Sequence, residues 1–133
     1  MSGPLVQSFN VLTTLTTQRL VAQDTSAAHT VVYPPSNQRM PLGVTIDDVK
    51  AITQGIPVQL NGKAKLYFND TVASGSLVAA DTSGRGVPFT LPNTTTSVTL
   101  AAAYAGVLCD ASVAATGTIA QIIIAPGFVR VSA

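Results

Sequence analysis

The chain has 133 residues, a formal net charge of +1 and charged side chains at only 10% of its positions. Its seven basic and six acidic residues are spread along the sequence, so it lacks the basic patch that drives nucleic-acid binding. We therefore expect no nucleic-acid partner. No apolar run approaches the ~20 residues of a membrane-spanning helix, and we expect no membrane partner.

The composition predicts strands and few exposed helices. Thr, Val, Ala and Gly are abundant, and Thr and Val favour strands. Glu, a common residue on the exposed faces of helices, is absent. A single cysteine cannot form a disulfide within the chain. With 47% hydrophobic residues, little remains to solvate a free surface, which favours a protein that lies against partners. We predict one all-β domain, a small barrel or sandwich.

The first segment mixes apolar residues with Ser, Thr, Gln and Asn, is β-prone and has no charged residue before Arg19. We predict that residues 1–17 form an extended N-terminal arm and that residues 18–133 form the β-rich domain. An ordinary first strand of that domain is the alternative. Strands are next expected at residues 19–22, 30–33 and 42–46.

The clearest strand pattern follows in the centre of the chain. Asn61-Gly62 separates two β-prone runs, residues 56–60 and 63–68, and predicts a hairpin because both turn positions favour a positive φ. In the second run Lys63 and Lys65 alternate with apolar residues, which predicts one wet face and one buried face. A further strand is expected at residues 76–80.

The C-terminal third predicts three strands. After a strand at residues 98–105, the continuous apolar run Ile122–Ala125 predicts a central strand that is buried on both faces. Residues 126–131 are typical of an edge strand.

Two parts of the chain have similar spacing. Gly43-Val44 precedes a glycine that opens a strand, and Gly106-Val107 does the same with a gap that differs by one residue. Each copy predicts a strand, a short excursion and a second strand. Two such copies could curl a small sheet into a barrel by pairing with each other.

These residues resemble the small capsid decoration, or cement, proteins of tailed bacteriophages. The resemblance covers about residues 20–125, and its motifs are turn glycines and strand hydrophobics, which specify a fold better than an activity. Leu60 and Ile122 stand where valine is typical. The matching residues are Gly43, Val44, Gly55, Val58, Leu60, Gly62, Ala64, Val72, Gly75, Leu77, Val78, Asp81, Gly84 and Arg85, with Gly106, Val107, Gly117 and Ile122 as a second set.

The resemblance implies a compact β-barrel-like protein, often trimeric, that is clamped on the outside of a phage head. Its partners would be the major capsid protein and other copies of the chain. It would be made in the cytoplasm of a bacterial host, would lie on the outer capsid surface of the virion and would use no cofactor. A head-fibre or tail-associated structural trimer is the alternative.

Eight side chains are candidates for contact with the shell or with another subunit. Arginine and aromatic residues are favoured in interfaces, because the guanidinium can bind a carboxylate through two hydrogen bonds and an aromatic ring is a large anchor. Arg85 lies in a glycine-flanked loop that would let it reach outward. The candidates are Leu5, Phe9, Leu12, Arg19, Tyr33, Arg39, Arg85 and Arg130.

The sequence supports an enzymatic function less well than a structural one. Asp81-Thr82-Ser83-Gly84 is similar to the loop of a dimeric aspartic protease, but Ser83 intervenes before the glycine, and a turn between strands is favoured. An aspartic-type hydrolase centred on Asp81 is kept as the alternative. The sole histidine, His29, and the sole thiol, Cys109, have no clustered ligands around them, so we expect neither catalysis nor a metal site.

Overall fold

The computed structural model describes residues 5–36, 39–47, 55–90, 100–112 and 116–131, and within them every regular element is a strand. The prediction of an all-β domain is therefore confirmed. The strands are β1 (Val6–Val11), β2 (Leu20–Gln23), β3 (Thr30–Val32), β4 (Gly43–Thr45), β5 (Ile56–Gln59), β6 (Gly62–Tyr67), β7 (Leu77–Ala80), β8 (Gly86–Pro88), β9 (Leu100–Leu108) and β10 (Ile119–Val131).

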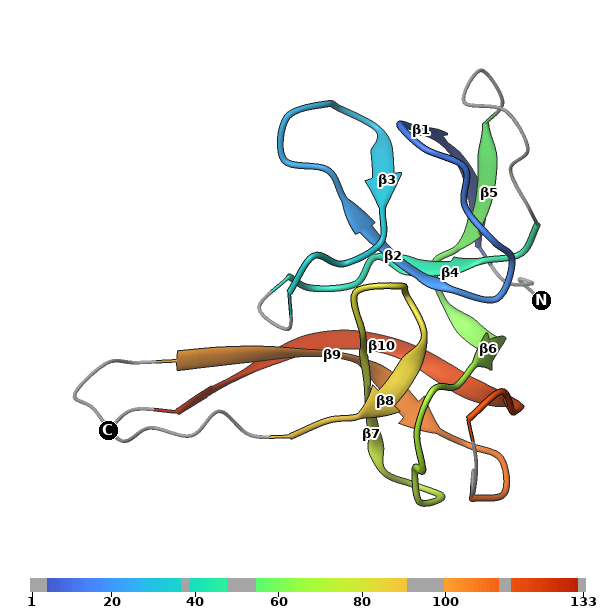
Figure 1. Cartoon of the computed structure of the whole chain (residues 1–133), viewed down its shortest axis with the longest axis vertical. Coiled ribbons are helices and arrows are strands. Elements are labelled where there is room, and N and C mark those ends of the chain that lie inside the picture. The colour runs from blue at the N-terminus through green and yellow to red at the C-terminus, as the bar shows by residue number, and fades with distance from the viewer. Residues whose placement is uncertain (1–4, 37–38, 48–54, 91–99, 113–115, 132–133) are drawn as a thin grey trace.

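The first five strands form a closed barrel in the order β1-β3-β2-β4-β5, drawn above the second sheet in Figure 1. β1 closes it by pairing with β3 in parallel and with β5 antiparallel, where Val6 faces Gln59 and Phe9 faces Ile56. The segment expected to be an extended arm thus supplies the first strand of the domain, as its alternative had it. The physical reason is the apolar face of β1, which the barrel interior buries.

The other five strands form a sheet in the order β6-β10-β9-β7-β8. β10 is an interior strand that pairs antiparallel with the edge strand β6 on one side and with the middle strand β9 on the other. An isolated bridge between Phe68 and Gly86 joins the ends of the two edge strands, so the sheet curls. β9 and β10 continue together as a two-stranded ribbon that extends from the body of the molecule (Figure 1).

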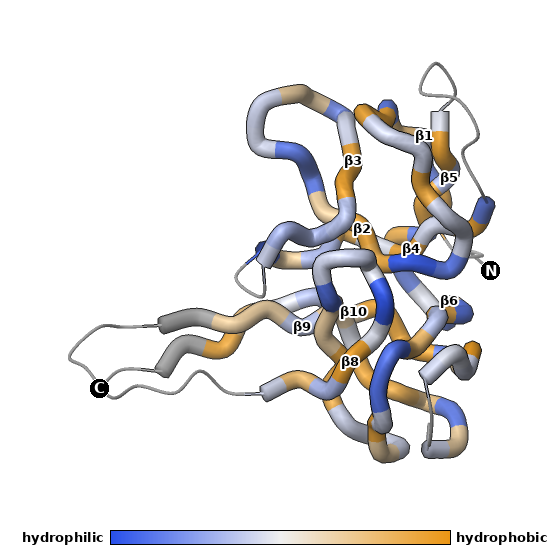
Figure 2. The backbone as a smooth tube through the Cα atoms, in the orientation of Figure 1, coloured by the Kyte–Doolittle hydropathy of each residue, from blue (hydrophilic) through white to orange (hydrophobic). Residues whose placement is uncertain are grey.

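Each half has its own core, and the barrel contributes to both. In β2, Val21 lies in the barrel core, whereas the adjacent Leu20 lies in the core of the second sheet together with Val44 of β4. Successive strand residues point to opposite faces, which places these neighbours in different cores. Orange, hydrophobic stretches accordingly occur on strands of both halves in Figure 2. The two halves therefore share buried side chains.

The predicted hairpin at Asn61-Gly62 is wrong, because β5 and β6 lie in different sheets. Of the two predicted turn positions, Gly62 has a positive φ of 77° and Asn61 does not, so the signal marked the change of direction but not the hairpin turn. The Gln59 side-chain amide donates to the Asn61 and Lys63 carbonyl oxygens at 2.8 and 2.6 Å and holds the chain as it passes from one sheet to the other. The turn joins the two halves instead of two neighbouring strands.

The two similar segments each form an antiparallel strand pair, β4 with β5 and β9 with β10. In both pairs the glycine allows close contact between strands, since a Cβ at Gly43 would overlap the Gln59 carbonyl and one at Gly106 the Ile123 carbonyl. The pairs lie in different sheets, so the expectation that the copies pair with each other is wrong.

The predicted alternation in β6 is confirmed, with Ala64 and Leu66 buried and both lysines exposed. β10 is an interior strand, second from the edge, and is buried on one face only. Ile122 is fully buried, whereas Ile123 is 43% exposed. Residues 126–131 continue β10 beyond a bulge between Ile124 and Gly127 instead of forming a separate edge strand.

Candidate functional site

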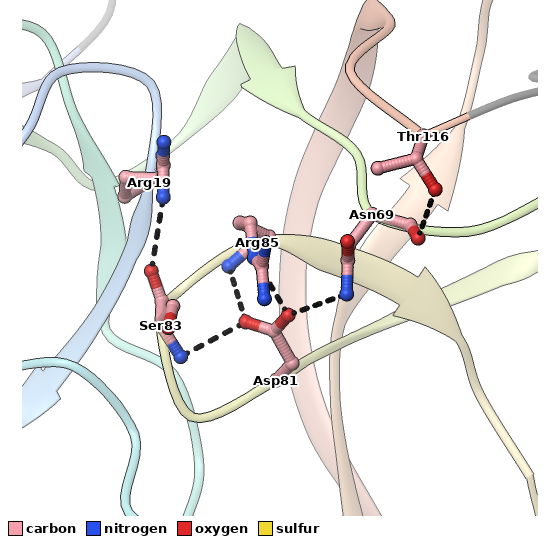
Figure 3. Close-up of polar contacts among 6 residues, drawn as sticks. All are labelled: Arg19, Asn69, Asp81, Ser83, Arg85 and Thr116. Atoms are coloured by element: carbon pink, nitrogen blue, oxygen red, sulfur yellow. Dashed lines mark hydrogen bonds and ion pairs between the residues drawn. The ribbon is translucent and has the colours of Figure 1, made fainter.

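The Asp81 carboxylate organises the turn between β7 and β8 (Figure 3). Its Oδ1 accepts hydrogen bonds from the backbone N–H groups of Ser83 and Arg85, both at 2.9 Å. Its Oδ2 accepts from Arg85 Nε at 2.9 Å and from the side-chain amide of Asn69 at 3.1 Å. Both carboxylate oxygens are thus engaged in holding the turn, which is the arrangement that the turn interpretation predicts.

The same network reaches into neighbouring segments. The Asn69 N–H donates to the Gly86 carbonyl at 2.9 Å, and the Thr116 hydroxyl donates to the Asn69 carbonyl at 2.8 Å. These contacts join β8, the residues after β6 and the loop before β10. An aspartic-type hydrolase needs two carboxylates that share a proton, whereas Oδ2 of Asp81 accepts hydrogen bonds from a guanidinium and an amide. The geometry therefore favours a structural role for this side chain.

Arg19 connects the barrel to the second sheet. Its guanidinium lies 4.6 Å from the centroid of the Tyr67 ring in β6, a cation–π distance, and Nη1 donates to the Ser83 carbonyl at 3.4 Å. The next residue, Leu20, donates its N–H to the Gly84 carbonyl at 2.6 Å. Arg19, predicted as an external contact, is largely occupied within the fold.

Gly84 makes this approach possible. Its φ is +75°, and a Cβ there would overlap the Leu20 carbonyl oxygen and lie 2.8 Å from the Tyr33 ring. Both the backbone conformation and the space therefore favour glycine. Tyr33, another predicted contact, is half-buried against the barrel core, and its hydroxyl accepts a hydrogen bond from the Thr16 N–H at 2.8 Å.

Arg39 and Asp24 stabilise the end of β2. Arg39 donates to the Gln23 carbonyl at 3.1 Å. Asp24 Oδ2 accepts hydrogen bonds from the Ser26 hydroxyl and from the N–H groups of Ser26 and Ala27. The Ser26 hydroxyl is the largest cause that lowers the pKa of Asp24 below its ordinary value, and the charge of Arg39 adds a smaller contribution.

The remaining candidates fall into three groups. Phe9 is 8% exposed and belongs to the barrel core, so it is not a free surface anchor. Leu5 and Leu12, at the two ends of β1, are 47% and 52% exposed and remain available for contact. Arg130 pairs with Ala101 across the ribbon, and its side chain lies outside the described residues. Leu5 and Leu12 are therefore the exposed residues among the candidates whose side chains are described.

Sequence reasoning missed the outer face of β10. Ile119 and Ile123 are 48% and 43% exposed, and the register places Ile123 between Lys63 of β6 and Val107 of β9. A hollow of about 330 Å³ lies beside this face and is lined in part by Ile46, Lys63 and Lys65. The continuous apolar run hid this face, because it predicted burial on both sides.

Among the described residues, no group of three or more His, Cys, Asp or Glu side chains could hold a metal ion. No helix in the described ranges is long and apolar enough to cross a membrane.

No protein-family model matches the chain, and no curated protein sequence matches it. Among solved structures it is similar to the crystal structure of the head fiber gp8.5 N base of bacteriophage phi29. The TM-score is 0.67 at 14% sequence identity, over 92% of this chain and 95% of that one. The likeness therefore covers both the barrel and the second sheet, and at this identity it shows a shared fold.

Proposed function

We propose that this chain is a structural protein of a phage virion that binds the outer surface of the head and stabilises the shell as a cement protein. The observation that carries the proposal is the fold, which is shared over nearly the whole chain with a head fiber base. The exposed apolar side chains supply the kind of surface that such an attachment needs. We propose no enzymatic activity.

A head-fibre base is the second candidate, and the identity of the structural neighbour favours it directly, because that protein is the base of a head fiber. A cement protein and a fibre base both have to attach to the shell from outside. They differ in the number of copies per particle and in what the chain carries away from the shell. We keep both because the same fold suits either role.

The proposed mechanism is mechanical. Each subunit would bury apolar surface against the major capsid protein, and many modest contacts around a closed shell would add up through avidity. Assembly into homotrimers remains a prediction from the resemblance. Because β1 is paired on both sides within the barrel, we propose attachment through formed surfaces instead of strand addition by a free arm.

Cosedimentation of the purified protein with expanded, undecorated phage heads tests this proposal. Saturation near one copy per capsid subunit is expected for a cement protein, whereas saturation at a small number of sites per particle would identify a fibre base. Heads of an unrelated phage serve as the control for non-specific sedimentation. Failure to bind any matched head would refute both candidates.

A further inference from the structure

The strand β10 divides the outer face of the second sheet into a basic flank and an acidic flank. On one side, β6 presents Lys63 and Lys65, which are opposite Ile123 and Gln121 in the register. On the other side, β9 ends at Leu108 and Asp110 follows it after one residue. Lys65 and Asp110 both line a hollow of about 370 Å³ together with Ile119 and Gln121.

These charges are available for a partner. The one ion pair of the described residues joins Arg85 to Asp81, so neither lysine nor Asp110 is paired within this part of the chain. Asp110 Oδ1 accepts the Ala111 N–H at 2.9 Å, which leaves Oδ2 for another donor. Between the two flanks lie the exposed side chains of Ile119 and Ile123. The face therefore carries an apolar centre between opposite charges.

We propose that this face pairs with the same face of a second copy, around a two-fold axis that runs along β10. Such an axis exchanges the two flanks, so β6 of one copy lies over β9 of the other. Lys65 then faces Asp110 of the second copy, twice in each dimer, and Lys63 lays its aliphatic stem over Val107. Ile119 and Ile123 pack against their own counterparts at the centre.

Two general features of sheets and oligomers support this arrangement. Packed sheets keep their strand directions within roughly 30° of each other, which a two-fold axis near the direction of β10 satisfies. A two-fold interface uses one self-complementary surface, and this face has cations on one flank and a carboxylate on the other. A face of single charge would instead repel its own copy. The contact does not depend on shell binding and is separate from any three-fold contact.

A charge-swap experiment on the full chain tests the pairing. We expect the wild type to self-associate through this face at equilibrium, as a dimer or, where the three-fold contact forms as well, as paired trimers. Lys65→Asp or Asp110→Lys alone should weaken this two-fold association at least about tenfold, because each creates two like-charge contacts per pair. An equimolar mixture of the two variants should recover the dimer, since every contact then joins opposite charges. No effect within one chain can produce that recovery.

The Thr13→Asp and Thr13→Lys variants are the matched controls, because Thr13 is exposed next to the barrel strand β1, and both should dimerise as the wild type does. Circular dichroism melting of every variant checks that the fold is intact. A monomeric wild type, a mixture that stays monomeric, or a trimer that ignores the swap would overturn the proposal. So would variants that lose head binding while their mass in solution is unchanged, because the shell would then occupy this face.

Discussion

The barrel and the second sheet differ in how their strands find hydrogen-bonding neighbours. In the barrel, short strands of three to six residues pair in a closed ring, so each strand has two neighbours. In the second sheet, β9 and β10 are nine and thirteen residues long, and the edge strands meet only at the Phe68–Gly86 bridge. Of the eight large hydrophobic side chains that are exposed within the described ranges, three lie on β10. Closure pairs both edges of every barrel strand, whereas the second sheet leaves one face of β10 exposed.

The strongest test of this comparison removes a large side chain from each core. Phe68→Ala in the second sheet and Phe9→Ala in the barrel should each reduce the free energy of unfolding by about 3–5 kcal/mol. Phe68 is fully buried and Phe9 is 8% exposed. Since Leu20 and Val44 of the barrel lie in the core of the second sheet, we expect one cooperative transition for both variants by denaturant unfolding.

The wild type, unfolded in parallel, gives the reference for cooperativity. Two separated transitions in Phe9→Ala, with the second at the wild-type midpoint, would mean that the halves fold independently.

A second test concerns the junction between the halves. Gly84→Ala should lower the free energy of unfolding by about 1–3 kcal/mol. Residue 84 has a positive φ, and the added Cβ would press on the Leu20 carbonyl and the Tyr33 ring. Gly75→Ala is the matched control, since Gly75 has a φ of +81° with no atom within 4 Å of its Cβ. The difference in melting midpoint isolates packing from backbone strain, and equal losses would contradict a role for the packing.

Asp81→Asn tests the turn on the sheet side of that junction. The variant keeps the shape of the side chain but loses the charge that accepts from Arg85, and we expect a loss of about 1–3 kcal/mol in the free energy of unfolding. Asp70→Asn, at an exposed position, is the control and should change stability little. If Asp81→Asn leaves stability unchanged but abolishes a hydrolytic activity of the wild type, the hydrolase interpretation would replace the structural one.

The smallest effect is expected in the barrel, at Asp24. Because hydrogen bonds from Ser26 lower the pKa of Asp24 in the folded state, its contribution to stability is present above the unfolded pKa and is lost as the pH falls through the folded pKa. Asp24→Asn should therefore remove part of the acid destabilisation between about pH 5 and pH 2. Unfolding curves across this range measure it, and identical pH profiles for the two proteins would contradict the assignment.

Local patterns predicted the strands better than their partners. The alternation in β6 was sufficient to place Lys63 and Lys65 on the exposed face. The Asn61-Gly62 signal identified the turn but could not reveal that the flanking strands pair elsewhere, because a sheet is chosen by contacts distant in sequence. The same limitation applies to Phe9 and Arg19, whose partners come from β5 and β6. Their residue types indicated that these side chains make contacts, but the contact partners depend on the fold.

The position of Asn61-Gly62 also has a consequence for synthesis. Every barrel strand precedes Asn61, and every strand of the second sheet begins at Gly62 or later. The ribosome therefore completes the barrel segment before it starts the segment of the second sheet. Domains fold as units from the N-terminus during translation. The barrel can therefore close before β10 is synthesised. Leu20 and Val44 then remain uncovered until the strands of the second sheet have been made. During that interval these two side chains, which become part of the core of the second sheet, are exposed to solvent.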